Sequence, residues 1–169
     1  MSNKLRMIGA VASVCLIFDQ ITKFLVVRLI PRGASFHVCR FFAISHVRNS
    51  GILWGLFREY PGTNVFMVGI SVVIFALLAV YALRVRVLSV TGAVALGMLE
   101  GGILGNLVDR VRVSRVIDFL DFRVWPVFNV ADACIVTGVA LTVFCTLRGQ
   151  RTGDGKKTGV TGADIARME

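Results

Sequence analysis

Acidic residues are scarce in this chain. Only 10 of its 169 residues are Asp or Glu, against 19 Lys and Arg, and all charged residues together make up 17%. Hydrophobic residues make up 56%, and the mean hydropathy is +0.76. Because an ordinary soluble domain has about 25% charged residues, this composition argues against a soluble protein. It indicates a chain whose apolar surface faces lipid.

Cysteine is scarce too, and the spacing of the cysteines does not indicate a disulfide framework. The four cysteines are Cys15, Cys39, Cys134 and Cys145. Three of them fall in long apolar stretches, where a buried thiol is usually a small hydrophobe. No CxxC or Cys/His spacing indicates zinc, and we interpret His37 and His46 as polar groups of a loop. The sequence therefore predicts no metal site and no cofactor.

Long apolar stretches, in contrast, are abundant. They are residues 7–30, 64–83, 87–107 and 130–147. Each is close to the roughly 20 residues that cross a bilayer as a helix. We therefore expect an all-α membrane protein, a bundle of four transmembrane helices with both termini on the same side.

The start of the chain also resembles a cleaved signal peptide, because Lys4 and Arg6 precede an apolar run. Residues 12–15 even look faintly like a lipoprotein cleavage box. However, Val14 is larger than the residue that such a box has before its cysteine, and the apolar run continues past Asp19. We expect an uncleaved first span.

The net charge of +9 is dispersed over tails and loops, so it does not indicate a nucleic-acid partner. In a membrane protein, Lys and Arg concentrate on the cytoplasmic side. The two sides of this chain hold nearly equal numbers. The density is higher on the side of the termini, where a six-residue N-terminal tail and the turn at 84–86 hold two basic residues each. We therefore place both termini in the cytoplasm.

The segments outside the spans differ in character. The first loop, 31–63, is rich in aromatic and β-branched residues, which predicts one or two strands near the membrane surface. Residues 49–62 contain three glycines around an apolar face and predict a short interfacial segment ending at Pro61. Residues 150–169 are polar and Gly-rich, which predicts a disordered cytoplasmic tail after a membrane-embedded domain of residues 1–149.

Some charged residues interrupt the spans, where they are costly and usually functional. Asp19 and Lys23 are four apart, so they share a helix face and can form an ion pair. The sequence leaves open whether this pair is structural or takes part in chemistry. Glu100 lies in the third span, where it either reaches lipid headgroups or pairs with Arg110 or Lys23.

The segment 101–110 reads GGILGNLVDR. Its three glycines let another helix approach closely. Asn106, Asp109 and Arg110 follow at i, i+3 and i+4, so they share one face at the end of the span. Because Asp109 adjoins Arg110, the sequence predicts an ionised structural pair.

Two further carboxylates lie between the last two spans, in VIDFLDFRVWPVFNVAD. Asp118 is embedded among apolar residues, and Asp132 opens the fourth span, where Asn129 can cap the helix. Two carboxylates that cannot both ionise easily are typical of acid–base chemistry. Spacing alone leaves Asp132 equally well explained as a first-turn carboxylate stabilised by the helix dipole. Asp121, in the same segment, is not excluded.

Taken in order, the segments FDQITK, NSGILWG, GGILGNLVDR, VIDF and FNVAD resemble the motifs of the lipoprotein signal peptidases (signal peptidase II). The resemblance implies an aspartic endopeptidase of the bacterial cytoplasmic (inner) membrane that cleaves diacylglyceryl-modified prolipoproteins before the lipidated cysteine. It also implies a small periplasmic β-cradle, an interfacial arm, an active site facing the periplasm or outside, and sensitivity to globomycin-type inhibitors.

By the same resemblance, the catalytic residues are Asp118 and Asp132. The supporting or substrate-binding residues that it implies are Asp19, Lys23, Asn49, Gly51, Asn106, Asp109, Arg110, Asn129 and Ala131. The chain departs from the family pattern in the bulky Ile52 and Leu53, in Glu100, and in a shorter connection between the two catalytic motifs.

Two carboxylates that share one proton can hydrolyse a peptide bond without a metal, because one activates water while the other polarises the carbonyl. Two other classes of protein also place acids in membranes. A proton-coupled transporter would distribute them through the midplane or show inverted repeats, and a non-catalytic scaffold would use them as packing contacts. Here the polar residues gather at one membrane face, and no repeat is evident.

Overall fold

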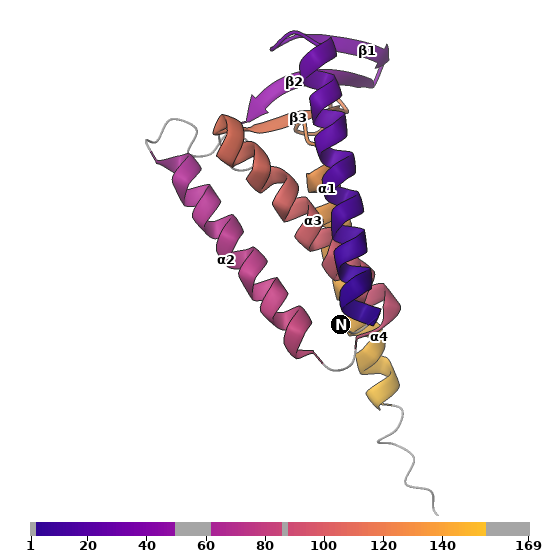
Figure 1. Ribbon diagram of the computed structural model, residues 1–169. Helices are drawn as coiled ribbons and strands as arrows, with labels where there is room; N and C mark the ends of the chain where they lie inside the picture. The colour runs from indigo at the N-terminus through magenta and orange to yellow at the C-terminus, as the bar shows by residue number, and fades with distance from the viewer. Residues whose placement is uncertain (1–2, 50–61, 86–87, 155–169) are drawn as a thin grey trace, which may run out of the picture.

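The computed structural model describes residues 3–49, 62–85 and 88–154. Its elements follow in the order α1 (Asn3–Leu29), β1 (Ser35–Cys39), β2 (Phe42–Asn49), α2 (Thr63–Arg84), α3 (Val90–Val113), β3 (Val116–Asp121) and α4 (Val130–Asp154). All four helices are long and apolar enough to cross a membrane, which confirms the predicted spans. The three strands lie together at one end of the helices, here called the sheet end (Figure 1).

The helix ends differ from the predicted spans for local reasons. Ser89 caps α3, because its hydroxyl accepts a hydrogen bond from the Gly92 amide at 3.0 Å. At its other end α3 runs six residues beyond the predicted 107 and stops at Ser114, whose backbone is left-handed at φ 55°. This extension keeps Asp109 and Arg110 on the helix. Helix α4 continues to Asp154, into the segment predicted as tail.

Helix α3 forms the centre of the bundle and packs against α1, α2 and α4. Its glycines permit this close approach, as the sequence predicts. A Cβ built on Gly101 would lie 2.5 Å from the carbonyl oxygen of Ala12 in α1, and one on Gly102 would lie 2.5 Å from that of Ala131 in α4. The polar residues that follow on α3 are thereby brought against both neighbouring helices.

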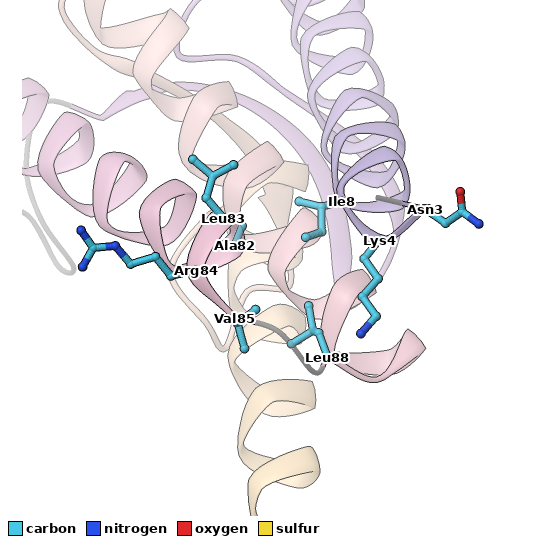
Figure 2. Close-up of a pocket in the computed structure, with 8 residues that line it drawn as sticks. All are labelled: Asn3, Lys4, Ile8, Ala82, Leu83, Arg84, Val85 and Leu88. Carbon is cyan, nitrogen blue, oxygen red and sulfur yellow. The ribbon is translucent and has the colours of Figure 1, made fainter. Parts of the chain in front are cut away.

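Helix α2 is separated from the rest of the bundle and packs mainly on α3 (Figure 1). None of its described side chains is buried, and large apolar residues such as Phe66 and Leu77 are more than 60% exposed. Surfaces of this kind are stable in lipid and costly in water. Near the end opposite the sheet, α1 and α2 border a cavity (Figure 2).

The strands form one antiparallel sheet in the order β1-β2-β3. Strands β1 and β2 confirm the prediction for the first loop. The third strand was not predicted, and it contains Asp118, paired in register with Val47 of β2. The predicted interfacial segment lies almost entirely outside the described residues, and so does the end of the predicted tail.

Candidate active site

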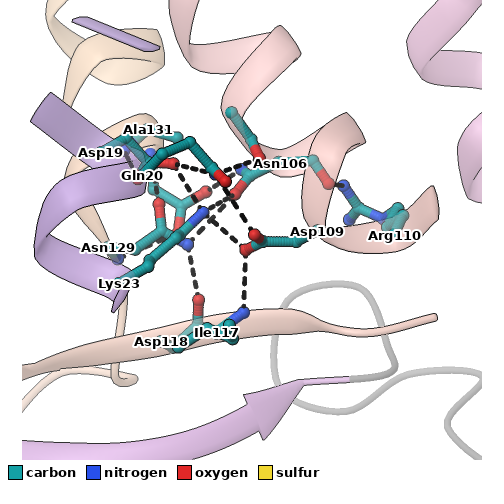
Figure 3. Close-up of polar contacts among 12 residues, drawn as sticks. Asp19, Gln20, Lys23, Asn106, Asp109, Arg110, Ile117, Asp118, Asn129 and Ala131 are labelled. Atoms are coloured by element: carbon teal, nitrogen blue, oxygen red, sulfur yellow. Dashed lines mark hydrogen bonds and ion pairs between the residues drawn. The ribbon is translucent and has the colours of Figure 1, made fainter. Parts of the chain in front are cut away.

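A network of buried polar side chains lies at the sheet end, where α1, α3, β3 and α4 meet (Figure 3). Asp19 and Lys23 come from α1, Asn106 and Asp109 from α3, and Asp118 from β3. Asn129 and Asp132 come from the start of α4. All of them except Asp132 are at most 7% exposed. Segments more than a hundred residues apart in the sequence thus meet in one polar core.

Asp118 lies on β3 with 2% of its surface exposed. Its Oδ2 accepts a hydrogen bond from Asn49 Nδ2 at 3.0 Å, and its Oδ1 accepts one from Asn129 Nδ2 at 2.6 Å. The pKa of Asp118 is raised to about 6, chiefly by burial and also by the charge of Asp132, while the hydrogen bonds from the two amides and the charge of Lys23 act in the opposite direction. The carboxyl therefore retains a proton much closer to neutral pH than an ordinary aspartate does.

Asp132 lies in the first turn of α4 and exchanges hydrogen bonds with Asn129. The Asp132 amide donates to Asn129 Oδ1 at 2.9 Å, and the Asn129 amide donates to Asp132 Oδ2 at 3.2 Å. This reciprocal cap confirms the predicted role of Asn129 at the helix start. The other carboxylate oxygen of Asp132 accepts a hydrogen bond from Asn106 Nδ2 at 2.7 Å.

Asn129 connects the two carboxylates. It is fully buried, and it bonds Asp118 with its side-chain amide and Asp132 with its backbone. Its Nδ2 also donates to Asn106 Oδ1 at 3.2 Å. Asp118 on the strand and Asp132 on the helix are therefore both hydrogen-bonded to one buried residue.

Lys23 is the cation of a second group of acids. Its Nζ lies 2.8 Å from a carboxylate oxygen of Asp19 and 2.8 Å from one of Asp109, and it donates to Asn106 Oδ1 at 3.1 Å. With 1% of its surface exposed, Lys23 is shielded from bulk solvent. The Asp19–Lys23 pair predicted from spacing is confirmed, and its burial between three helices favours the structural alternative.

The predicted pairing of Asp109 with Arg110 is wrong. Asp109 pairs with Lys23 instead, and no ion pair joins it to Arg110 within the described parts of the chain. Successive residues on a helix point about 100° apart, so Asp109 faces α1 while Arg110 points elsewhere. Arg110 donates to the Asn106 carbonyl at 3.4 Å and lies close enough to Asp118 and Asp132 to interact with their charges.

Asp109 also fixes the strand that holds Asp118. Its Oδ2 accepts a hydrogen bond from the backbone amide of Ile117 at 3.1 Å. Because Ile117 directly precedes Asp118, this contact ties the position of Asp118 to α3 and, through Lys23, to α1. Ala131 is tied down similarly, since it is fully buried and its amide donates to Asp19 Oδ1 at 2.8 Å.

Gln20 is a member of the network that the sequence reasoning missed. Its Nε2 lies 3.2 Å from Asp19 Oδ2, 3.2 Å from the Gly105 carbonyl and 3.3 Å from Asp109 Oδ1. One amide group thus contacts both acids that flank Lys23. The available signal was its position inside an apolar span, directly beside Asp19.

Two of the acids singled out in the sequence do not join the network in the described structure. Asp121 accepts from Ser45 at 3.0 Å and lies 3.7 Å from the Arg123 Nε, on the more exposed part of β3. Glu100 is buried, but it pairs with neither Lys23 nor Arg110 in the described part of the structure. Gly51 lies outside the described residues. Within the described ranges, no group of three or more His, Cys, Asp or Glu side chains is arranged to hold a metal.

Comparisons with known proteins agree on one family. The sequence model of the family "Signal peptidase (SPase) II" matches residues 11–148. A lipoprotein signal peptidase of Halothermothrix orenii is 35% identical over 151 residues, which is 88% of this chain and all of that protein. One of Pelotomaculum thermopropionicum is 39% identical over 138 residues, 81% of this chain and 89% of that protein.

A solved structure of a bacterial membrane enzyme has the same fold. It is 32% identical in sequence, superposes with a TM-score of 0.76, and covers 83% of this chain and 87% of its own. Sequence and structure thus agree over most of the chain. The chain belongs to the signal peptidase II family.

Proposed function

We propose that this protein is an aspartic endopeptidase in which Asp118 and Asp132 form the catalytic pair. It removes signal peptides from diacylglyceryl-modified prolipoproteins by cleaving before the lipidated cysteine. The observation that carries the proposal is the arrangement at the sheet end. There Asn129 bonds two carboxylates from different elements, and neither forms an ion pair with a basic residue in the described structure.

The environments of the two carboxylates suit different halves of the reaction. A pKa of about 6 leaves roughly a tenth of Asp118 protonated at pH 7, about a hundredfold more than for an ordinary aspartate. Asp132 accepts two N–H donors at the positive end of the α4 dipole, an arrangement that stabilises an anion. Protonated Asp118 therefore polarises the scissile carbonyl, while Asp132 accepts a proton from the attacking water.

The network around Lys23 holds this pair in place. Lys23 orients Asn106, which in turn donates to Asp132. On the other side, Lys23 orients Asp109, which anchors the strand next to Asp118. Placing two reacting groups within a fraction of an ångström requires such fixed neighbours.

The location of the site suits a substrate with a lipid and a peptide part. The site lies where the helices end and the sheet begins (Figure 1). The diacylglyceryl chains can stay in the bilayer while the peptide bond meets water at its edge. We place the protein in the bacterial inner membrane with both termini in the cytoplasm and the sheet end outside, the face at which globomycin-type inhibitors would bind. Arg110 and Asn49, beside the carboxylates, would contact the substrate.

Cleavage of a purified lipid-modified precursor by the full-length protein tests the proposal. Asp118→Asn and Asp132→Asn should each reduce the rate by at least about a thousandfold, because an amide neither accepts nor relays the proton. Asp121→Asn is the matched control, since it makes the same change three residues along β3 and should retain near-normal activity. Normal turnover by either pair variant would remove that residue from the mechanism.

A chelator separates the proposed chemistry from metal-dependent hydrolysis. Cleavage should be unchanged by EDTA, and loss of activity that zinc restores would overturn the metal-free mechanism. A protein that folds and inserts but never cleaves the precursor would favour the transporter or scaffold alternatives.

A further inference from the structure

Asp109 is tied to β3 through one of its two carboxylate oxygens. Its Oδ2 accepts a hydrogen bond from the Ile117 amide at 3.1 Å and lies 2.8 Å from Lys23 Nζ. Because Ile117 directly precedes Asp118, the direction in which this carboxylate points affects where β3 holds Asp118. The torsion that turns a carboxylate has a broad minimum, so bonds to one oxygen leave its plane free to rotate. The position of Asp118 therefore depends also on what holds Oδ1 of Asp109.

Lys23 has no donor left for this oxygen. An ammonium has three N–H donors. Lys23 Nζ lies 2.8 Å from one carboxylate oxygen of Asp19 and 2.8 Å from Oδ2 of Asp109, and it donates to Asn106 Oδ1 at 3.1 Å. Each donor thus has one acceptor. Among the residues that the structure describes, the donor to Asp109 Oδ1 is Gln20, whose Nε2 lies 3.3 Å away.

The amide of Gln20 is itself held in place. Its Nε2 lies 3.2 Å from the Gly105 carbonyl and 3.2 Å from Asp19 Oδ2. Gly105 precedes Asp109 by one turn of α3, so the amide bridges α1 and α3 at the level of the acid (Figure 3). A side chain with acceptors on two packed helices keeps a defined rotamer. Gln20 is therefore directed at Asp109.

A neutral donor suits this position. A glutamine supplies N–H groups to the two acids beside Lys23 without adding charge. A second cation here would favour loss of the proton from Asp118, and a third acid would repel Asp19 and Asp109. The amide can therefore orient Asp109 while it leaves the charge around the proposed catalytic pair unchanged.

We propose that Gln20 is a positioning residue for the hydrolysis carried out by Asp118 and Asp132. By holding Oδ1 of Asp109, it fixes the carboxylate whose other oxygen anchors β3 at Ile117. In the described structure the hydrogen bonds of Gln20 reach neither acid of the proposed pair, so it acts through Asp109. This role rests on the proposed function, because it belongs to the same reaction.

Kinetics of precursor cleavage by the full-length protein test this role. Gln20→Met keeps the length of the side chain and removes its N–H donors. Its kcat per folded protein should fall about tenfold, because a small displacement of a reacting group is costly. KM should stay within about twofold, since Arg110 and Asn49, the residues proposed to contact the substrate, are unaltered. A wild-type kcat, or a loss that only follows a lower Tm, would overturn the proposal.

Thr22→Val is the matched control on the same helix. The Thr22 hydroxyl lies 2.9 Å from the Phe18 carbonyl and 2.8 Å from the Asp19 carbonyl, both within α1. The variant removes a polar group close to Gln20 and leaves the contacts of Asp109 intact. Its kcat should match that of the wild type. A loss equal to that of Gln20→Met would show a general sensitivity of α1 and overturn the specific role.

Hydrogen exchange of the Ile117 amide tests the anchor without a substrate. In protein labelled with ¹⁵N-isoleucine, this amide should exchange faster in Gln20→Met than in the wild type, while that of Ile103 within α3 should not change. Unchanged exchange at Ile117 would overturn the proposal even if the wild type cleaves the precursor. A wild type that never cleaves would instead overturn the proposed function, and with it any role of Gln20 in the reaction.

A double variant tests whether Gln20 acts through Asp109. Adding Gln20→Met to Asp109→Asn should change kcat per folded protein by less than about twofold, because residues that act through one contact are not additive. A further tenfold loss would show that Gln20 acts by another route and overturn the proposal. If Asp109→Asn yields too little folded protein, the exchange of Ile117 in Gln20→Met decides the same question.

Discussion

Two groups of buried acids lie side by side at the sheet end, and they differ in their partners. Asp19 and Asp109 both contact the ammonium of Lys23 at 2.8 Å. Asp118 and Asp132 are held by amides, chiefly those of Asn49, Asn106 and Asn129. The first two acids therefore have a charged partner, whereas Asp118, which is held by neutral amides, has a pKa raised to about 6. We therefore propose that the first group supports the fold and that the second carries out the chemistry.

Removing the cation should have the largest effect on stability. Lys23→Met leaves Asp19 and Asp109 buried together without a counter-charge, and breaking a buried pair in this way costs about 3–5 kcal/mol. We expect a large fall in Tm or in the yield of folded protein. Thermal unfolding in detergent measures it, with Arg28→Met, which replaces the exposed basic residue on the last turn of the same helix, as control. Wild-type stability of Lys23→Met would contradict a structural role for this group.

Neutralising one acid from each group should give opposite results. Asp109→Asn weakens the contact with Lys23 and should cost about 1–3 kcal/mol, with activity falling mainly because less protein is folded. Asp118→Asn should keep a Tm near or above that of the wild type and lose cleavage entirely. A stable but inactive Asp109→Asn protein, together with an active Asp118→Asn protein, would mean that the catalytic pair has been assigned to the wrong acids.

The stability difference between Asp118→Asn and the wild type should depend on pH. The pKa of Asp118 is about 6 in the folded protein against an ordinary value of 3.8, so folding is penalised when this group must ionise. The penalty is absent below about pH 4, grows as the pH rises toward 6, and is complete above it. Between pH 4 and 7, the Tm of the variant should therefore rise relative to that of the wild type. A constant difference over this range would show that Asp118 is not perturbed.

The sequence predicts those contacts of the two groups of acids that join residues close together in the chain. Asp19 and Lys23 are four residues apart on one helix, and Asn129 caps the helix that begins one residue later, so both contacts follow from the helix period. The glycines of α3 similarly predict its close packing. The two acids of the proposed pair stood out because each lies at the edge of an apolar segment.

The contacts that the sequence could not predict join distant segments. Asp109 has an arginine as its neighbour in the chain, yet its partner is Lys23, 86 residues away, because the two helices pack face to face. Strand β3 was not predicted, because its pairing with β2 depends on how the helices bring the two loops together. The contacts of Gln20 with α3 belong to the same class.

The smallest effect should come from shortening α4 at the end away from both groups of acids. The proposed site uses residues 129–132 at the start of this helix, and Gly149 lies 17 residues beyond Asp132, about 25 Å along the axis. The apolar part that spans the membrane already ends at Arg148. Truncation after Gly149 should therefore change precursor cleavage by less than about twofold, because a deleted end contributes only through the contacts it makes. The measurement compares kcat/KM of the truncated and full-length proteins, with Tm as a check on folding. A severe loss of cleavage at unchanged Tm would contradict this expectation and show that the end of α4 affects the activity of the acids at its start.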